Sequence, residues 1–257
     1  MNTADRVEFT KEMRDYTILA PNMADIHFSL LINIFSQYGY RVELLKNDGR
    51  TVGDEGLKYV HNDTCYPALL VIGQLIDALN TGKYDPDKTA LMITQSGGGC
   101  RASNYIHLLR KALKKAGYPQ VPVISLNLSR LEKNSGFKIR ISMALKMLSA
   151  VIYGDLIMLL KNQVEPYEKN EGECKRLVQK WIDGISEMFR KGRGYSFGEM
   201  KKLLPEITKS FSEVPVKNIV KTKVGVVGEI YVKYSPLANN HLEEFLFGQG
   251  CEVMVPG

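Results

Sequence analysis

A chain of 257 residues, 44% of them apolar and 24% charged, is long enough for one large domain or two small ones with a packed core. This composition excludes intrinsic disorder, and four scattered cysteines exclude the disulfide scaffold of a small secreted protein. The net charge of +6 is concentrated in residues 130–222, where 18 basic and 11 acidic residues give +7. Such a segment suits nucleic acid, an acidic partner or a phosphorylated ligand. We favour a solvated helical surface, because the basic residues are mixed with glutamates and no nucleic-acid-binding motif is present.

The N-terminal segment and the longest apolar run both favour a cytoplasmic protein. Residues 1–15 carry charges of both signs and no apolar run, which argues against a secretory signal. Residues 143–160 come closest to a membrane span, but Lys146 and Asp155 interrupt the run of roughly 18 apolar residues that a span needs. We therefore expect reduced thiols and contact with neither membrane nor nucleic acid.

The first 130 residues alternate between strand and helix patterns. Short apolar runs bounded by turn residues predict four strands, at residues 16–20, 41–45, 89–95 and 121–125. Apolar residues at helical spacing predict three helices between them, at about residues 25–38, 68–79 and 105–116. Strands that alternate with helices in this way form an open, parallel, Rossmann-like α/β sheet.

The remainder of the chain changes pattern twice. Residues 131–222 predict a helical segment, with helices at about 138–160, 174–189 and 197–211, the last kinked or divided at Pro205. Residues 223–257 begin a new strand-and-helix pattern that is too short to bury its own faces. We therefore expect three parts: a first α/β domain at 1–130, a helical segment at 131–222, and the start of a second, truncated α/β domain at 223–257.

The loop after the third predicted strand has the composition of an anion site. Consecutive glycines let the backbone approach a ligand, and the helix behind them offers free N–H groups. The loop lacks the ending of a P-loop and the spacing of a dinucleotide fingerprint, so a tight turn with positive φ explains the glycines equally well. The candidate cofactor-binding residues are Gly97, Gly98, Gly99, Arg101 and Asn104.

Two cysteines lie at the heads of predicted helices. Cys100 stands beside Arg101, where a helix N-terminus and a guanidinium should lower the pKa of its thiol. Cys65 follows a loop, and we expect both thiols in one pocket at the carboxyl edge of the sheet. Two converging thiols suggest an iron–sulfur cluster, a zinc site or a redox pair. Two unconnected buried cysteines are the alternative.

Both cysteine-containing segments carry a resemblance to a known family. The sequences HNDTCYPALLVIGQ at 61–74 and TQSGGGCRASNY at 94–105 resemble the 2-hydroxyacyl-CoA dehydratase-related family. The resemblance is closer to the dehydratase-like portion of large acyl-CoA dehydratase activase-related proteins. Shorter matches extend it over nearly the whole chain, at residues 82–85, 153–155, 165–168 and 227–229.

This resemblance implies an anaerobic, cytoplasmic protein with two α/β domains and a helical segment. It implies a [4Fe–4S] cluster, with Cys65 and Cys100 matching the first two of three cysteine ligands. The third would come from missing residues, a partner subunit or a second copy. We leave Cys251 unassigned, because it stands before a strand rather than after one, and we expect Cys174 at the surface.

The same resemblance implies partners and a function. It implies an ATP-dependent activase, present as a domain or a subunit, that donates electrons, together with an acyl-CoA ligand and a homodimer or heterodimer. The leading hypothesis is thus an iron–sulfur protein related to 2-hydroxyacyl-CoA dehydratases, as a fragment or subunit of a lyase system, with no catalytic residue or substrate assigned. The alternative is a non-catalytic scaffold or an anion- or nucleotide-binding module whose glycine turn holds the ligand.

Overall fold

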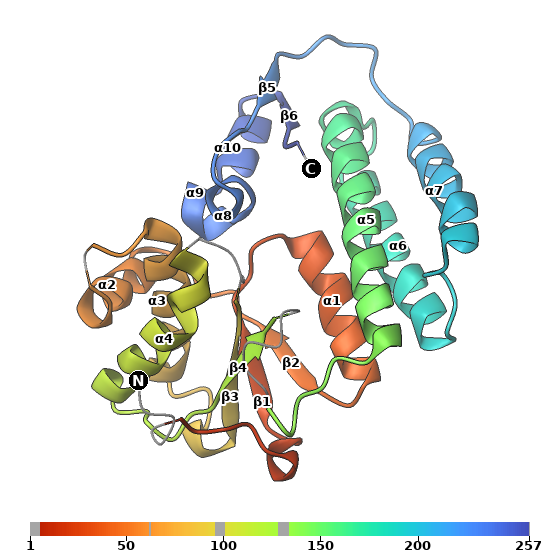
Figure 1. The fold of residues 1–257 in the computed structure, drawn as a ribbon. Coiled ribbons are helices and arrows are strands. Elements are labelled where there is room, and N and C mark those ends of the chain that lie inside the picture. Colours follow the sequence, from red (N-terminus) through yellow and green to blue (C-terminus); the bar gives the residue numbers. More distant parts are fainter. Residues whose placement is uncertain (1–5, 62, 96–100, 128–133, 257) are drawn as a thin grey trace. The chain divides into compact units, whose positions relative to one another are not determined.

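The structure, a computed structural model, describes residues 6–61, 63–95, 101–127 and 134–256 (Figure 1). The chain forms two compact units. Unit 1 contains residues 1–22 and 39–139, and unit 2 contains residues 23–38 and 140–257. This division differs from the expected three parts. Residues 23–38 belong with the later helices, and the C-terminal residues share a unit with the helical segment.

Unit 1 is built on the predicted parallel sheet. Its strands are β1 (Thr17–Ala20), β2 (Arg41–Leu44), β3 (Thr89–Thr94) and β4 (Val123–Leu126), in the order β2-β1-β3-β4. Every pairing is parallel, and Thr17 lies between Arg41 and Thr89. Successive residues such as Ile18 and Leu19 are both fully buried, as is usual for the continuous apolar strands of parallel sheets. The Rossmann-like α/β class is therefore confirmed.

Three helices pack together in unit 1, and α4 contacts β3 and β4 (Figure 1). They are α2 (Arg50–Tyr59), α3 (Tyr66–Asn80) and α4 (Tyr105–Ala116), with short 3₁₀ turns η2 (Lys11–Met13), η3 (Pro86–Lys88) and η4 (Arg101–Asn104). The sequence patterns predicted α3 and α4 but not α2. Gly56 of α2 and Gly73 of α3 lie at the contact between these helices, and a methyl group on Gly73 would come within 2.8 Å of the Gly56 backbone nitrogen. The two backbones are therefore in direct contact.

Unit 2 is mainly helical. Its long helices are α1 (Asp25–Gln37), α5 (Ile141–Val164), α6 (Glu173–Arg190) and α7 (Phe197–Ser212), and η5 (Glu165–Tyr167) follows α5. Helix α1 packs against α5 and α6, and α5 packs against α7. Their core includes the fully buried side chains of Tyr153 and Phe189. Pro205, which was expected to kink or divide the last helix, does not divide it: α7 begins with a Ser196–Glu199 capping box and continues through the proline.

Residues 141–167 are long and apolar enough to cross a membrane, by length and composition. A core helix passes the same test, and 39% of the most apolar window is buried within the protein. Within unit 2, α5 packs against three other helices and a strand, and it also carries Lys146 and Asp155. The same helix leaves large apolar side chains exposed, among them Ile141 and Leu148.

The C-terminal residues form a second, smaller sheet, as predicted. Strands β5 (Lys223–Gly225) and β6 (Glu252–Met254) pair in parallel and do not join the first sheet. Between them lie α8 (Ile230–Tyr234), α9 (Pro236–Asn239) and α10 (Leu242–Gly248). The apolar side chains of Val226, Val253 and Val255 pack against Met158 of α5. This small β–α–β element therefore buries one apolar face against the helices of unit 2.

Candidate functional site

Cys65 lies at the carboxyl edge of the first sheet. It is the N-cap residue of α3, which belongs to the crossover between the parallel strands β2 and β3, and the heads of such crossover helices lie at the carboxyl edge of the sheet. The thiol is partly exposed, and its Sγ lies 2.9 Å from the hydroxyl oxygen of Tyr105. Tyr105 is the first residue of α4, the helix that follows β3. The heads of α3 and α4 therefore meet at this thiol.

A hydrogen-bonded network joins the end of β3 to its neighbours at the same edge. The Gln95 side chain donates to the Ser103 carbonyl oxygen at 2.9 Å and accepts from the Ser125 hydroxyl at 2.7 Å. The Asn127 side chain in turn donates to the Ser125 hydroxyl at 2.7 Å. Gln95 thus connects both sides of the glycine-rich loop to β4. Sequence reasoning assigned no role to these polar residues, because only the pairing of β3 with β4 brings them together.

The predicted cofactor-binding residues are only partly within the described chain. Gly97, Gly98, Gly99 and Cys100 lie outside the described residues. Arg101 begins η4, and Asn104 is the exposed N-cap residue of α4, without a capping hydrogen bond from its side chain. The shared pocket of the two cysteines therefore stays a prediction, because the structure describes the position of Cys65 but not that of Cys100.

The remaining cysteines are not placed as cluster ligands. Cys174 is fully buried, which corrects the expectation of a surface position. Burial, followed by the nearby carboxylates of Glu165 and Glu168, raises the pKa of its thiol to about 12. Cys251 is partly exposed and precedes β6 in unit 2. Among the described residues, no group of three or more His, Cys, Asp or Glu side chains could hold a metal ion.

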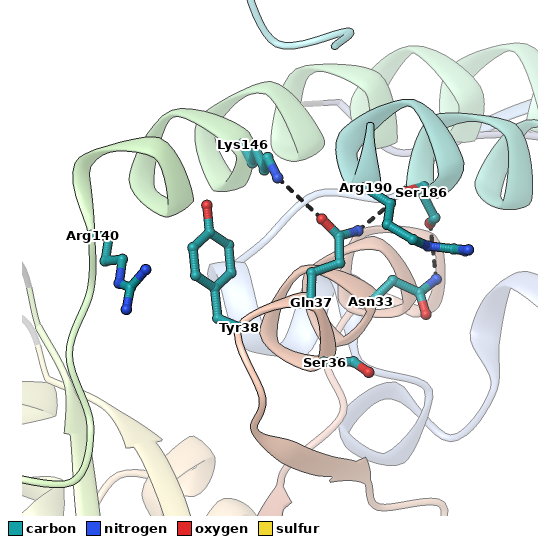
Figure 2. Close-up of a pocket in the computed structure, with 8 residues that line it drawn as sticks. All are labelled: Asn33, Ser36, Gln37, Tyr38, Arg140, Lys146, Ser186 and Arg190. Carbon is teal, nitrogen blue, oxygen red and sulfur yellow. Dashed lines mark hydrogen bonds between the residues drawn. The ribbon is translucent and has the colours of Figure 1, made fainter. Parts of the chain in front are cut away.

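Unit 2 contains a second candidate site, a polar pocket of about 690 Å³ (Figure 2). It lies between the C-terminal ends of α1 and α6 and the first turns of α5. No carboxylate is among the described residues that line it. Those residues are Asn33, Ser36, Gln37, Tyr38, Arg140, Lys146, Ser186 and Arg190.

Hydrogen bonds among amide, hydroxyl and ammonium groups join the three helices around the pocket. The Gln37 amide donates to the Ser186 carbonyl oxygen at 3.1 Å, and the Asn33 amide donates to the Ser186 hydroxyl at 2.9 Å. Lys146 is only 7% exposed and donates from Nζ to Gln37 Oε1 at 3.1 Å. Its Nζ also lies 5.3 Å from the centre of the Tyr38 ring. A buried ammonium group therefore contacts an amide oxygen and an aromatic face.

Sequence reasoning missed this pocket. Its cations lie at the start of α5 and at the end of α6, and no local motif joins them. The two available signals were the net charge of +7 over residues 130–222 and a lysine that interrupts an apolar run. The charge was interpreted as a solvated helical surface and the lysine only as an argument against a membrane span, but Lys146 is buried.

Comparison with known proteins gives no match to a protein-family model, to a curated protein or to a solved structure.

Proposed function

We propose that unit 1 binds an iron–sulfur cluster through Cys65 and Cys100. We further propose that the protein acts with an ATP-dependent activase in an acyl-CoA dehydratase-like system of a reducing, anaerobic cytoplasm. The observation that supports this proposal is the position of Cys65. It is a partly exposed thiol at a helix N-terminus, at the carboxyl edge of a parallel sheet. Ligands of open α/β sheets bind at this edge.

The surroundings of Cys65 suit a thiolate ligand. The Tyr105 hydroxyl, 2.9 Å away, can donate a hydrogen bond to the deprotonated sulfur. The thiol also lies at the positive end of the α3 macrodipole, which favours a negatively charged group bound there. Iron–sulfur clusters are held by cysteine thiolates, and hydrogen bonds to the sulfurs tune their reduction potential. Cys65 and Tyr105 therefore provide one ligand and one tuning group.

The other ligands have to come from elsewhere. Cys100 follows β3 by six residues, and the resemblance assigns it as the second ligand. The third would come from a second copy of the chain, a partner subunit or a further domain. A bound [4Fe–4S] cluster supplies one-electron transfer, and in the resembled family the acceptor is an acyl-CoA thioester. We assign no catalytic residue and no particular acyl group.

Anaerobic reconstitution of the full chain with ferrous iron and sulfide tests this proposal. Protein-bound iron and visible absorption would be measured for the unmodified chain and for the Cys65→Ala, Cys100→Ala and Cys251→Ala variants. We expect Cys65→Ala and Cys100→Ala to lose the cluster. Cys251→Ala removes another partly exposed thiol and should bind as much iron as the unmodified chain.

A fourth variant tests the role of Tyr105. Tyr105→Phe should retain the cluster but lower its reduction potential, because it removes a hydrogen-bond donor from the Cys65 sulfur. Equal iron uptake by the unmodified chain and all three cysteine variants would overturn the ligand assignment. That result would favour the alternative of a non-catalytic scaffold or anion-binding module.

A further inference from the structure

We infer that the polar pocket of unit 2 binds a phosphorylated small molecule. This site uses neither cysteine and is independent of the proposed iron–sulfur function. Its volume of about 690 Å³ falls within the range of roughly 300–1,000 Å³ that is typical of small-molecule sites. The pocket is larger than a free inorganic anion needs, so the ligand has a body as well as a charged group.

Lys146 is the strongest indication of an anionic ligand. Lysine is rarely buried without a charged partner, yet this side chain is more than nine-tenths buried. Among the described residues, no carboxylate lies within ion-pair distance of its Nζ. The contacts are the Gln37 oxygen and the ring faces of Tyr38 and Tyr195, 5.3 and 5.7 Å from Nζ. Its charge is therefore balanced by dipoles and ring electrons, and an anion in the pocket would complete the pairing.

Two arginines add charge at the exposed rim of the same pocket. The Arg140 guanidinium lies 6.0 Å from the centre of the Tyr38 ring, and no described carboxylate forms an ion pair with it. Arg190 pairs with Glu187 at 2.8 Å. Figure 2 shows Lys146 and Arg190 directed toward the Gln37 and Asn33 amides, with Arg140 beyond Tyr38. Three cations thus line a pocket that also contains amide and hydroxyl groups.

The chemistry of these groups favours a phosphoryl group. Guanidinium groups bind phosphate or carboxylate through two parallel N–H donors, and three cations favour a multiply charged anion. Ser36 adds an exposed hydroxyl group, whereas the Ser186 hydroxyl already donates to the Ile182 carbonyl oxygen. Helix α5 begins beside the pocket at Arg140, which places the positive end of its macrodipole there.

A purely structural role for the cations is the competing explanation. Helices α1 and α6 both end at the pocket, and cations stabilise the negative ends of helix dipoles. In that case the arginine variants would lower stability but the pocket would bind no anion. Calorimetric titration of the full chain with inorganic pyrophosphate, at low ionic strength, separates these explanations.

We expect pyrophosphate to bind at one site per chain and citrate to bind at least 10-fold more weakly. Arg140→Gln and Arg190→Gln should each weaken pyrophosphate binding by about 10-fold, the value of one charge-assisted hydrogen bond. Lys180→Gln removes an exposed cation from the same helix as Arg190 and should leave affinity unchanged. Glu187→Gln should tighten binding, because it frees Arg190 from its ion pair.

A variant of the buried lysine requires a check on folding. Lys146→Met should abolish pyrophosphate binding, and Lys146→Arg should retain part of it if both variants keep the helical circular dichroism of the unmodified chain. The Cys65→Ala protein should bind pyrophosphate normally, so that failure of the cluster proposal and failure of this one are distinguishable. No pyrophosphate binding, equal binding of citrate, or an equal loss in Lys180→Gln would overturn the assignment.

Discussion

Replacement of Gly73 by alanine tests the backbone contact between α2 and α3. A methyl group on Gly73 overlaps the carbonyl oxygen of Val52 and comes within 2.8 Å of the Gly56 nitrogen. Both atoms belong to the backbone, so no side-chain rotation relieves the overlap. The two helices must move apart, and the buried side chains between them lose contact.

The magnitude follows from two opposing effects. Alanine is favoured over glycine in a helix interior by about 1 kcal/mol. Overpacking of a well-packed contact costs typically about 1–3 kcal/mol, and a backbone clash lies at the upper end of that range. We therefore expect Gly73→Ala to lower the free energy of unfolding of unit 1 by about 2 kcal/mol, or its melting temperature by roughly 4–8 °C.

Urea unfolding followed by circular dichroism measures this change. Gly53→Ala provides the matched control, because Gly53 lies in α2 and a methyl group there meets nothing within 4 Å. The control should stabilise the protein by up to about 1 kcal/mol. A Gly73→Ala protein as stable as the unmodified chain would refute the proposed backbone contact.

Three further predictions concern thiols and a helix cap. Cys174 should resist alkylation by iodoacetamide at about pH 8 in the folded protein, because burial raises the pKa of its thiol to about 12. The partly exposed Cys65 should react, and mass spectrometry of the digested protein measures both. Ser196→Ala removes half of the capping box of α7 and should lower the free energy of unfolding by about 1 kcal/mol in urea, whereas no loss would contradict the cap. The Ser196 hydrogen bond lowers the pKa of Glu199 below its ordinary value of 4.5. The stabilisation by Glu199 is therefore present above that value and lost as the pH falls through the lowered pKa, so the difference in melting temperature between the unmodified chain and Glu199→Gln should shrink as the pH is lowered to about 3. A constant difference would refute this assignment.

The sheet was predictable because its strands are continuous apolar runs that need no distant information to identify. Helix α2 was not, because Gly49, Gly53 and Gly56 give its sequence the composition of a loop. Its stability depends on contact with α3, where Gly56 provides close approach. Local patterns predicted the existence of α1 but could not show that its partners are α5 and α6.

The candidate sites were likewise predictable only where local sequence and topology determine a residue's position. The position of Cys65 followed from topology alone, since the heads of crossover helices lie at the carboxyl edge of a parallel sheet. The predicted surface position of Cys174 was wrong, because the glutamates beside it in the sequence indicated an exposed segment, whereas its side chain is buried. In the structure, Glu168 turns inward and accepts hydrogen bonds from the backbone N–H groups of Gly172 and Cys174, at 2.6 and 2.8 Å. The pocket of unit 2 depends on tertiary packing, which no local spacing encodes.

The division of the chain has a consequence for its synthesis. Helix α1 is translated early but packs in unit 2 against α5 and α6, which begin more than 100 residues later. At roughly 5–20 residues per second, the ribosome needs on the order of 5–30 s to produce those partners. During that interval the apolar side chains of Leu30, Ile34 and Phe35, which are buried in the finished protein, have no partner on α5 or α6. The nascent chain should therefore expose α1 to chaperones until α5 and α6 have been synthesised. Ribosome-bound chains that end between α4 and α5 should keep such chaperones bound longest.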